Sequence, residues 1–194
     1  MVDGSKTSAV VALAFVLAVA AFLLCGCAST ASNGNDQIVK AAIELAEEYR
    51  SLGRLEDSIG VYDKALERTY DYRLLYNKAL TIANLGDFEQ AAALCQEGHG
   101  SFPYILAFKK AQAKYYIELE RWQDAASSYI EVLELDPYDT STRKALISLY
   151  VTNNEPSKAA EQATILWNQG YRTAETVGLM KVSLDPSLES SQED

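Results

Sequence analysis

The clearest structural pattern in the chain lies in residues 115–137, YYIELERWQDAASSYIEVLELDP. With Ala113 just upstream, its first half places small and aromatic residues at i, i+3 spacing. Its second half places apolar residues at i, i+4, i+7 and i+8, so the two halves predict amphipathic helices on either side of a turn at 119–121. Pro137 stops the second helix because proline cannot donate the next backbone hydrogen bond. The stretch is therefore a predicted helical hairpin.

The hairpin pattern recurs along residues 37–170 at a spacing of 33 or 34 residues. Such a period is typical of stacked helical pairs, in which a small residue lets two helices approach closely and an aromatic residue fills the space between pairs. Four series fall in phase: Ala46, Ala79, Ala113 and Ile147; Tyr49, Ile82, Tyr116 and Tyr150; Ser58, Ala91, Ala125 and Ala159; Leu55, Phe88, Trp122 and Pro156.

These repeats resemble tetratricopeptide repeats (TPRs), and the third repeat matches the family pattern best. The resemblance implies an all-α fold in which about four hairpins stack into a right-handed superhelix, because one hairpin alone leaves an apolar face exposed. Lys78, Gly98 and His99 depart from the pattern in the second unit, where we expect a weakened second helix, and Gln112 departs in the third. We expect a TPR domain at 37–184, with units at 39–71, 72–105, 106–139 and 140–173 and a capping helix at 174–184.

The N-terminal segment ends in Leu24-Cys25-Gly26-Cys27, which resembles the lipobox of bacterial lipoprotein signal peptides. The resemblance implies cleavage of residues 1–26 and acylation of Cys27, by palmitate or a similar chain, so that the domain is anchored on the extracytoplasmic side. The uncharged run 9–24 would make a helix of about 24 Å, shorter than the roughly 30 Å hydrocarbon core. Its length favours a cleaved signal over the alternative, an uncleaved anchor helix.

The residues beside the domain are polar. Residues 27–36 are expected to form a flexible tether and residues 185–194 a disordered acidic tail. Ala28 stands where some bacteria use aspartate to retain lipoproteins at the inner membrane, so the expected location is the outer membrane where a cell has one.

Composition excludes several classes of function. The net charge is -10, so nucleic acid is not an expected partner, because nucleic-acid binding depends on neutralising phosphates. Cys95 is the only cysteine after Cys27, which excludes a disulfide framework. His99 is the only histidine and is expected at a frayed helix end. With no metal-ligand cluster, phosphate loop or nucleophile motif, we expect neither a cofactor nor an enzyme.

Several aromatic residues and Cys95 stand at packing phases. We expect Cys95 to be a small buried hydrophobic residue. Five of the twelve tyrosines are expected in the core because they recur at those phases: Tyr49, Tyr62, Tyr116, Tyr129 and Tyr150.

The resemblance also implies a binding surface, because the first helix of each TPR hairpin lines the concave face. At those phases stand a predicted basic strip and one aromatic residue: Lys40, Arg73, Lys110, Lys114, Lys144 and Tyr76. We expect such a strip to bind an acidic peptide or a chain-terminal carboxylate, and the alternative is an ordinary solvated lysine face. Chaperone-binding TPRs grip a carboxylate at five phases that here hold Ile43, Glu47, Asn77, Ala107 and Ala111. Only Asn77 matches, so that mode is not expected.

The predicted function is therefore a non-enzymatic protein-interaction scaffold, anchored to the membrane in the bacterial cell envelope. Two alternatives stay open. The chain also resembles accessory lipoproteins for outer-membrane barrel or pilus secretin assembly, and TPR lipoproteins that pair with solute-binding transporter subunits. An apolar channel or pocket within the stack favours the transport role, whereas an exposed basic groove favours peptide capture.

Overall fold

The computed structural model describes residues 34–184, and all of their regular secondary structure is helical. The predicted signal segment, Cys27 and the acidic tail lie outside the described residues. The helix over 34–51 includes the last three residues of the expected tether, 34–36. The helices that follow are α2 (Leu55–Leu66), α3 (Tyr72–Asn84), α4 (Phe88–Ser101), α5 (Ala107–Glu118), α6 (Trp122–Leu135), α7 (Thr140–Thr152), α8 (Pro156–Asn168) and α9 (Ala174–Leu184).

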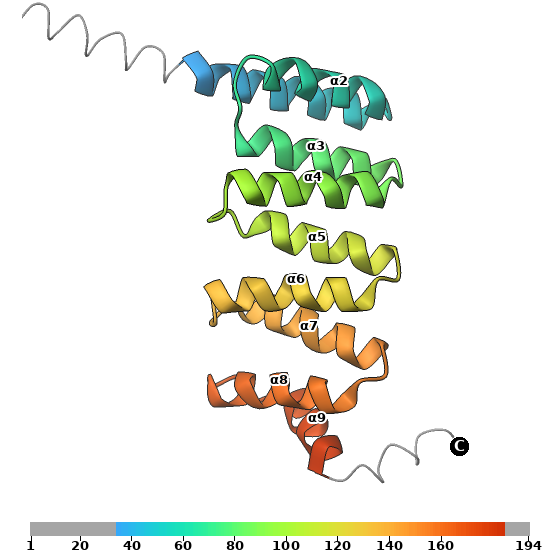
Figure 1. The fold of residues 1–194 in the computed structure, drawn as a ribbon, viewed down its shortest axis with the longest axis vertical. Coiled ribbons are helices and arrows are strands. Elements are labelled where there is room, and N and C mark those ends of the chain that lie inside the picture. Colours follow the sequence, from blue (N-terminus) through green and yellow to red (C-terminus); the bar gives the residue numbers. More distant parts are fainter. Residues whose placement is uncertain (1–33, 185–194) are drawn as a thin grey trace, which may run out of the picture.

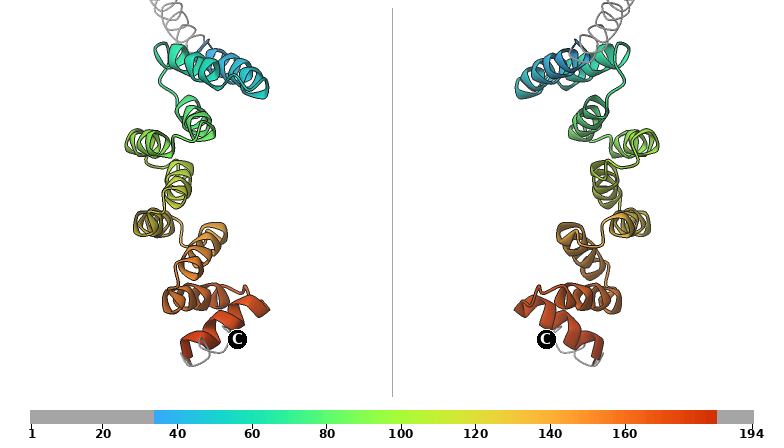
Figure 2. Two further views of the ribbon diagram at one scale, coloured as in Figure 1. Left: turned by 90° about the vertical axis from the view of Figure 1, so that its right-hand side faces the viewer. Right: turned by 90° about the vertical axis from the view of Figure 1, so that its left-hand side faces the viewer.

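The helices form a solenoid in which each element packs mainly on its neighbours in sequence, from α2 against α3 to α8 against α9. Figure 2 shows two layers: α2, α4, α6 and α8 lie on the outer side of a shallow curve, and the helix 34–51, α3, α5, α7 and α9 lie on the inner side. Four hairpins and a capping helix are thus present, which confirms the predicted fold class. No helix of the described residues is long and apolar enough to cross a membrane.

The small residues of the repeat make the close helix contacts that their phases predict. Ala46, Ala79 and Ala113 from the first helices are fully buried, as are Ala91 and Ala125 from the second helices. At these five positions a larger side chain would need more space between the two helices, and only the fourth hairpin holds a larger residue, buried Ile147, at the phase of Ala46. The repeat period thus specifies where the backbones approach most closely.

The turn inside every hairpin contains one residue with positive φ. Gly53 and Gly86 have φ of 74° and 86°, and the residues at the same phase in the next two hairpins, Glu120 and Asn154, have φ of 56° and 53°. The left-handed conformation ends a helix and turns the chain back, and glycine adopts it without a Cβ penalty. The third and fourth hairpins therefore keep the turn geometry with a residue less suited to it.

We expect Glu120→Gly to stabilise the protein by about 0.5–1 kcal/mol, because it removes the steric penalty of a left-handed non-glycine residue. Urea denaturation followed by helical circular dichroism measures the change. The matched control is Glu118→Gly, two residues away and still within α5. The control should destabilise by about the same amount, because glycine is a poor helix former. A destabilised Glu120→Gly variant would contradict the prediction.

Of the five tyrosines predicted to lie in the core, three are buried and two are half-buried. Tyr62, Tyr129 and Tyr150 are buried, as expected. Tyr49 and Tyr116 are half-buried instead, and each ring is covered by the arginine of its own turn, with Arg54 4.7 Å and Arg121 4.5 Å from the ring centroids. A cation over the ring face completes the packing of these two tyrosines.

The second helix of the second hairpin is more regular than predicted. α4 continues through Gly98 and His99 to Ser101, so His99 lies in an intact last turn and not at a frayed end. Burial lowers the pKa of His99, and the nearby charge of Lys109 adds to this effect. Cys95 is fully buried in the same helix, as expected, and burial raises its pKa to about 12.

Candidate functional site

The residues of the predicted basic strip lie on four successive inner-layer helices. Lys40 is in the helix 34–51, Arg73 and Tyr76 are in α3, Lys110 and Lys114 are in α5, and Lys144 is in α7. The structure therefore places them along one side of the solenoid. Their contacts divide them into paired and unpaired cations.

Lys40 and Arg73 are neutralised by two carboxylates. Asp36 lies 2.9 Å from Lys40 and 2.8 Å from Arg73, and Asp71 lies 2.9 Å from Arg73. Hydrogen bonds from Lys40 and Arg73 lower the pKa of Asp36, and the hydrogen bond from Arg73 lowers that of Asp71. Asp71 also caps α3 by accepting from the Arg73 backbone N–H. This end of the strip carries balanced charge.

Lys110 is also paired, because its ammonium group lies against the carboxylate of Asp139. Asp139 caps α7 by accepting from the backbone N–H groups of Ser141 and Thr142. Burial favours a raised pKa for Asp139, but hydrogen bonds from Lys110, Ser141 and Thr142 outweigh it and lower the pKa well below its usual range. The ion pair of Lys110 thus connects α5 to the N-terminus of α7.

Lys114 and Lys144 are exposed like Lys40, but unlike Lys40 neither makes an ion pair with a described residue. The Lys144 ammonium lies 5.8 Å from the centroid of the Tyr171 ring. Lys144 and Tyr171 line a cavity of about 70 Å³ together with Ile147 and Thr176. This cavity is too small for an ordinary small-molecule ligand, which needs about 300 Å³ or more. The members of the strip without an ion pair to a described residue are therefore on α5 and α7.

Tyr76, the predicted aromatic anchor, is half-buried. Its ring packs edge-on against Phe108 of α5, with centroids 5.7 Å apart, and burial raises the pKa of its hydroxyl. The ring therefore forms part of the wall between α3 and α5. The carboxylate clamp of chaperone-binding TPRs is not formed at its phases, because Asn77 donates to the Arg73 carbonyl of its own helix and Ala111 is buried.

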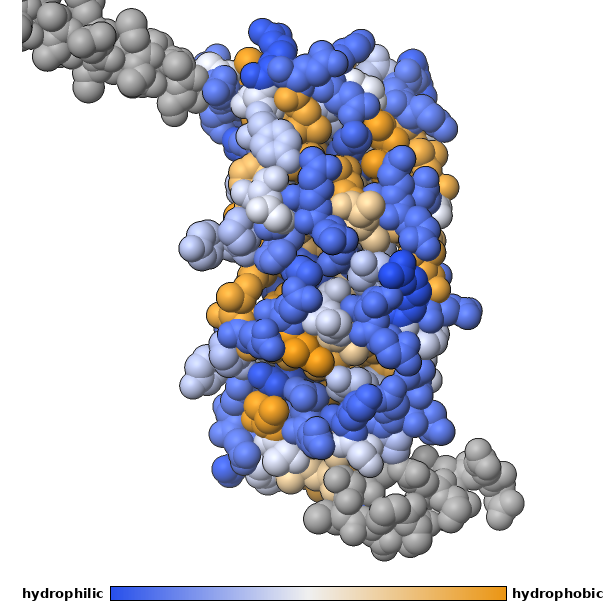
Figure 3. Space-filling view, in the orientation of Figure 1, coloured by the Kyte–Doolittle hydropathy of each residue, from blue (hydrophilic) through white to orange (hydrophobic). Residues whose placement is uncertain are grey.

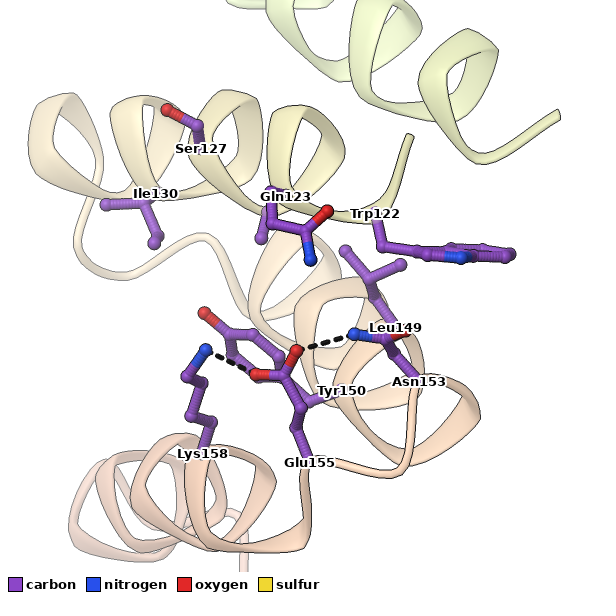
Figure 4. A pocket seen from close by; sticks show the side chains of 10 residues that line it. Trp122, Gln123, Ser127, Ile130, Leu149, Tyr150, Asn153, Glu155 and Lys158 are labelled. Carbon is purple, nitrogen blue, oxygen red and sulfur yellow. Dashed lines mark hydrogen bonds and ion pairs between the residues drawn. The ribbon is translucent and has the colours of Figure 1, made fainter. Parts of the chain in front are cut away.

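An open pocket that the sequence did not predict lies between α6 and the α7–α8 turn (Figure 4). Its volume is about 250 Å³, and Trp122, Ile130 and Tyr150 supply apolar surface. Glu155 accepts from Asn153 and pairs with Lys158 at its edge. These hydrogen bonds, first that of Lys158, lower the pKa of Glu155. In the sequence, this pocket could have been indicated only by Ile130, an apolar residue on the exposed side of α6.

Elsewhere the surface is mainly hydrophilic. In the view of Figure 3, hydrophilic residues cover most of the face and hydrophobic residues show in small separate groups. Within the described chain, no group of three or more histidine, cysteine, aspartate or glutamate residues is placed to hold a metal ion.

The comparisons with known proteins agree with this architecture. Residues 43–104 match the tetratricopeptide repeat family. The match covers most of the second unit, although that unit departs from the expected pattern at Lys78 and Gly98. Together with the fold, the match supports a TPR protein.

Solved TPR structures are similar to the chain. A tetratricopeptide repeat protein from Parabacteroides merdae has a TM-score of 0.64 at 15% identity, over 76% of this chain and 59% of that one. MamA from Desulfovibrio magneticus RS-1 has a TM-score of 0.58 at 14% identity, over 81% and 98%. The first TPR of Spaghetti (RPAP3), bound to an HSP90 peptide, has a TM-score of 0.54 at 20% identity, over 61% and 94%. At these identities the likeness shows the fold alone, and the chain spans about 59% of the length of the Parabacteroides protein.

Proposed function

Because this fold supports a protein–protein interaction scaffold, we propose that the protein is a lipid-anchored, non-enzymatic scaffold of the bacterial cell envelope. Its inner layer binds an acidic peptide segment of a partner protein. The observation that carries the proposal is the pair of exposed cations, Lys114 and Lys144, on adjacent inner helices, without ion pairs to described residues. A rigid helical stack loses little conformational entropy when it binds an extended segment.

The proposed site is the C-terminal half of the predicted strip, because the other cations of the strip are engaged in ion pairs. Lys40, Arg73 and Lys110 already have carboxylate partners, so an incoming acidic group would have to compete with them. Lys114 and Lys144 need no such exchange. The HSP90 peptide SRMEEVD, which is bound to the first TPR of RPAP3, is an acidic segment and supports this class of ligand for the fold.

The two alternative roles differ in what they require. A partner of a solute-binding subunit would need an apolar channel, and the inner-layer cavity at Lys144 measures only about 70 Å³. An accessory role in outer-membrane protein or pilus assembly is a special case of the scaffold, in which the acidic segment belongs to the assembling protein. We therefore propose peptide binding ahead of these two roles.

Selection of random displayed peptides on the full-length protein in detergent tests the ligand class. We expect acidic peptides to be enriched, because two unpaired cations attract them, and we expect Lys114→Glu/Lys144→Glu to lose the enrichment. Lys114→Arg/Lys144→Arg, which keeps both charges, is the matched control and should retain it. Enrichment of neutral or basic peptides, or equal enrichment by the Glu variant, would refute the proposed site.

The anchor is tested separately by metabolic labelling with an alkynyl fatty acid. We expect the label on the full-length protein and its membrane fractionation to disappear in Cys27→Ser, because the acylated thiol is missing. Cys25→Ser is the control and should keep both. A labelled Cys27→Ser variant, or an unlabelled wild-type protein, would overturn the lipid anchor and leave the peptide site standing.

A further inference from the structure

The N-terminal end of the described stack carries an open apolar face. The helix 34–51 and α2 form the last layer at this end (Figures 1 and 2). A shallow cavity of about 420 Å³ lies between them, and apolar and basic side chains line it. The residues used below are Ile38, Leu45 and Tyr49 of the helix 34–51, with Val61 and Lys64 of α2 and Arg68 in the turn that follows α2.

The repeat indicates what kind of surface this is. Ala41 has the phase of Leu74 and Phe108, and Leu45 has the phase of Leu146. In those later hairpins the three residues are fully buried, in first helices that pack on the second helix of the preceding hairpin: α3 on α2, α5 on α4 and α7 on α6. In the first hairpin, Ala41 is exposed and Leu45 is 45% exposed. The face is therefore of the type that packs against a helix.

Charged residues of opposite sign flank the apolar centre. Glu44 and Glu48 lie one turn apart on the helix 34–51, on the side opposite Ala46, which faces the core. Lys64 lies in the last turn of α2, and Arg68 lies in the turn that follows it. All four side chains are exposed, and none makes an ion pair with a described residue. One edge of the face is thus acidic and the other basic.

We propose that this face binds the same face of a second copy and forms a symmetric dimer. A two-fold axis parallel to the helices places the acidic edge of each copy on the basic edge of the other, as an isologous interface requires. The same operation packs the helix 34–51 antiparallel to the partner's α2. Antiparallel packing of a first helix on a second helix also occurs at the junctions inside the stack.

The charge of the hairpin argues against an anionic lipid surface as the occupant. Residues 34–71 contain five Lys and Arg and nine Asp and Glu, which gives 5 − 9 = −4. An anionic bilayer also has no positive charge to match Glu44 and Glu48, whereas a second copy offers a basic edge to the acidic edge and an acidic edge to the basic one. Two helices about 10 Å wide and 20 Å long present roughly 400 Å² per copy, less than the ~800 Å² of a standard interface, so the dimer is weak and forms at high protein concentration.

Sedimentation equilibrium of the full-length chain in mild detergent tests the apolar centre. We expect concentration-dependent dimers, and we expect Leu45→Glu to lower the association constant at least tenfold because it places a charge at the centre of the face. Leu85→Glu is the matched control, since Leu85 is 43% exposed but belongs to another hairpin, and it should leave association unchanged. Unchanged circular dichroism verifies that both variants fold. A monomeric wild-type protein, or a Leu45→Glu variant that still dimerises, overturns the proposal.

A charge exchange tests the symmetry. Lys64→Glu/Arg68→Glu and Glu44→Lys/Glu48→Lys should each fail to dimerise alone, because like charges then meet at both edges. An equimolar mixture of the two variants should recover dimers, because each altered edge then meets its opposite charge. A mixture that stays monomeric overturns the two-fold arrangement. Binding of the monomeric protein to anionic vesicles that Leu45→Glu abolishes would show that a bilayer is the occupant instead.

Discussion

Replacing Gly98 with leucine is expected to lower the free energy of unfolding by about 2–3 kcal/mol. A Cβ atom at Gly98 would lie 2.3–2.7 Å from three ring atoms of Phe108, far inside van der Waals contact. The ring is fully buried and packs on Tyr76, so it has no free space to move into. Gly98 therefore sets the separation of α4 and α5, and urea denaturation followed by circular dichroism measures the loss.

A double-mutant cycle identifies the clash as the cause. Phe108→Ala alone should cost about 3–5 kcal/mol, because it leaves a cavity. The combined Gly98→Leu/Phe108→Ala variant should cost at least 1 kcal/mol less than the sum of its parts, because leucine refills part of that cavity. Gly100→Ala, in the same helix with nothing within 4 Å, is the control and should be neutral or stabilising. Strict additivity of the two changes would contradict the prediction.

The repeat also explains why this pair arises. Ala65, Val132 and Leu166 stand at the phase of Gly98, and all three are buried. At Phe108 the facing residue is unusually large, and the glycine compensates in volume. Gly98 was expected to weaken its helix because glycine is a poor helix former when a helix is considered by itself, whereas the constraint on Gly98 comes from Phe108 on the facing helix.

Much of the fold was predictable because it depends on period. The alanines at 79, 113 and 125 are fully buried as their spacing requires, and Pro137 ends the third hairpin after α6. The turn geometry at Glu120 was not evident from residue type, because glutamate rarely adopts positive φ. It follows from the position instead, since Gly53 and Gly86 occupy the same phase.

The candidate site was less predictable because long side chains choose partners outside the period. Phase placed Lys110 on the inner layer but did not predict its pairing with Asp139. Two residues that depart from the family pattern also have partners on another helix. Lys78 pairs with Asp63 at 2.6 Å, and buried Gln112 donates to the Ala92 carbonyl at 3.4 Å. Such contacts depend on side-chain conformation across helices, which one sequence does not specify.

Removing the carboxylate of Asp139 is expected to destabilise the protein by about 2–4 kcal/mol in Asp139→Ala, because it removes a helix cap and leaves Lys110 without its counter-ion. The Asp139 side chain is 9% exposed and accepts four hydrogen bonds from Ser141 and Thr142, at 2.6–3.1 Å. Asp87→Ala is the matched control, an exposed cap that accepts one hydrogen bond from Gln90, and it should cost about 1 kcal/mol. Equal losses in the two variants would show that the Lys110 pair contributes nothing.

The pH dependence of Asp139→Asn separates charge from capping. Because the folded pKa of Asp139 lies below its usual value of 3.8, the unfolded chain takes up the proton first as the pH falls. The stabilisation from its charge is therefore fully present above about pH 5 and is lost progressively below pH 4, towards the lowered folded pKa. Asp36 and Asp71 shift in the same direction, so both proteins weaken in acid, but the gap in unfolding free energy between wild type and Asp139→Asn should narrow. A gap that stays constant down to about pH 2 would mean that the carboxylate acts only as a hydrogen-bond acceptor, as an amide can.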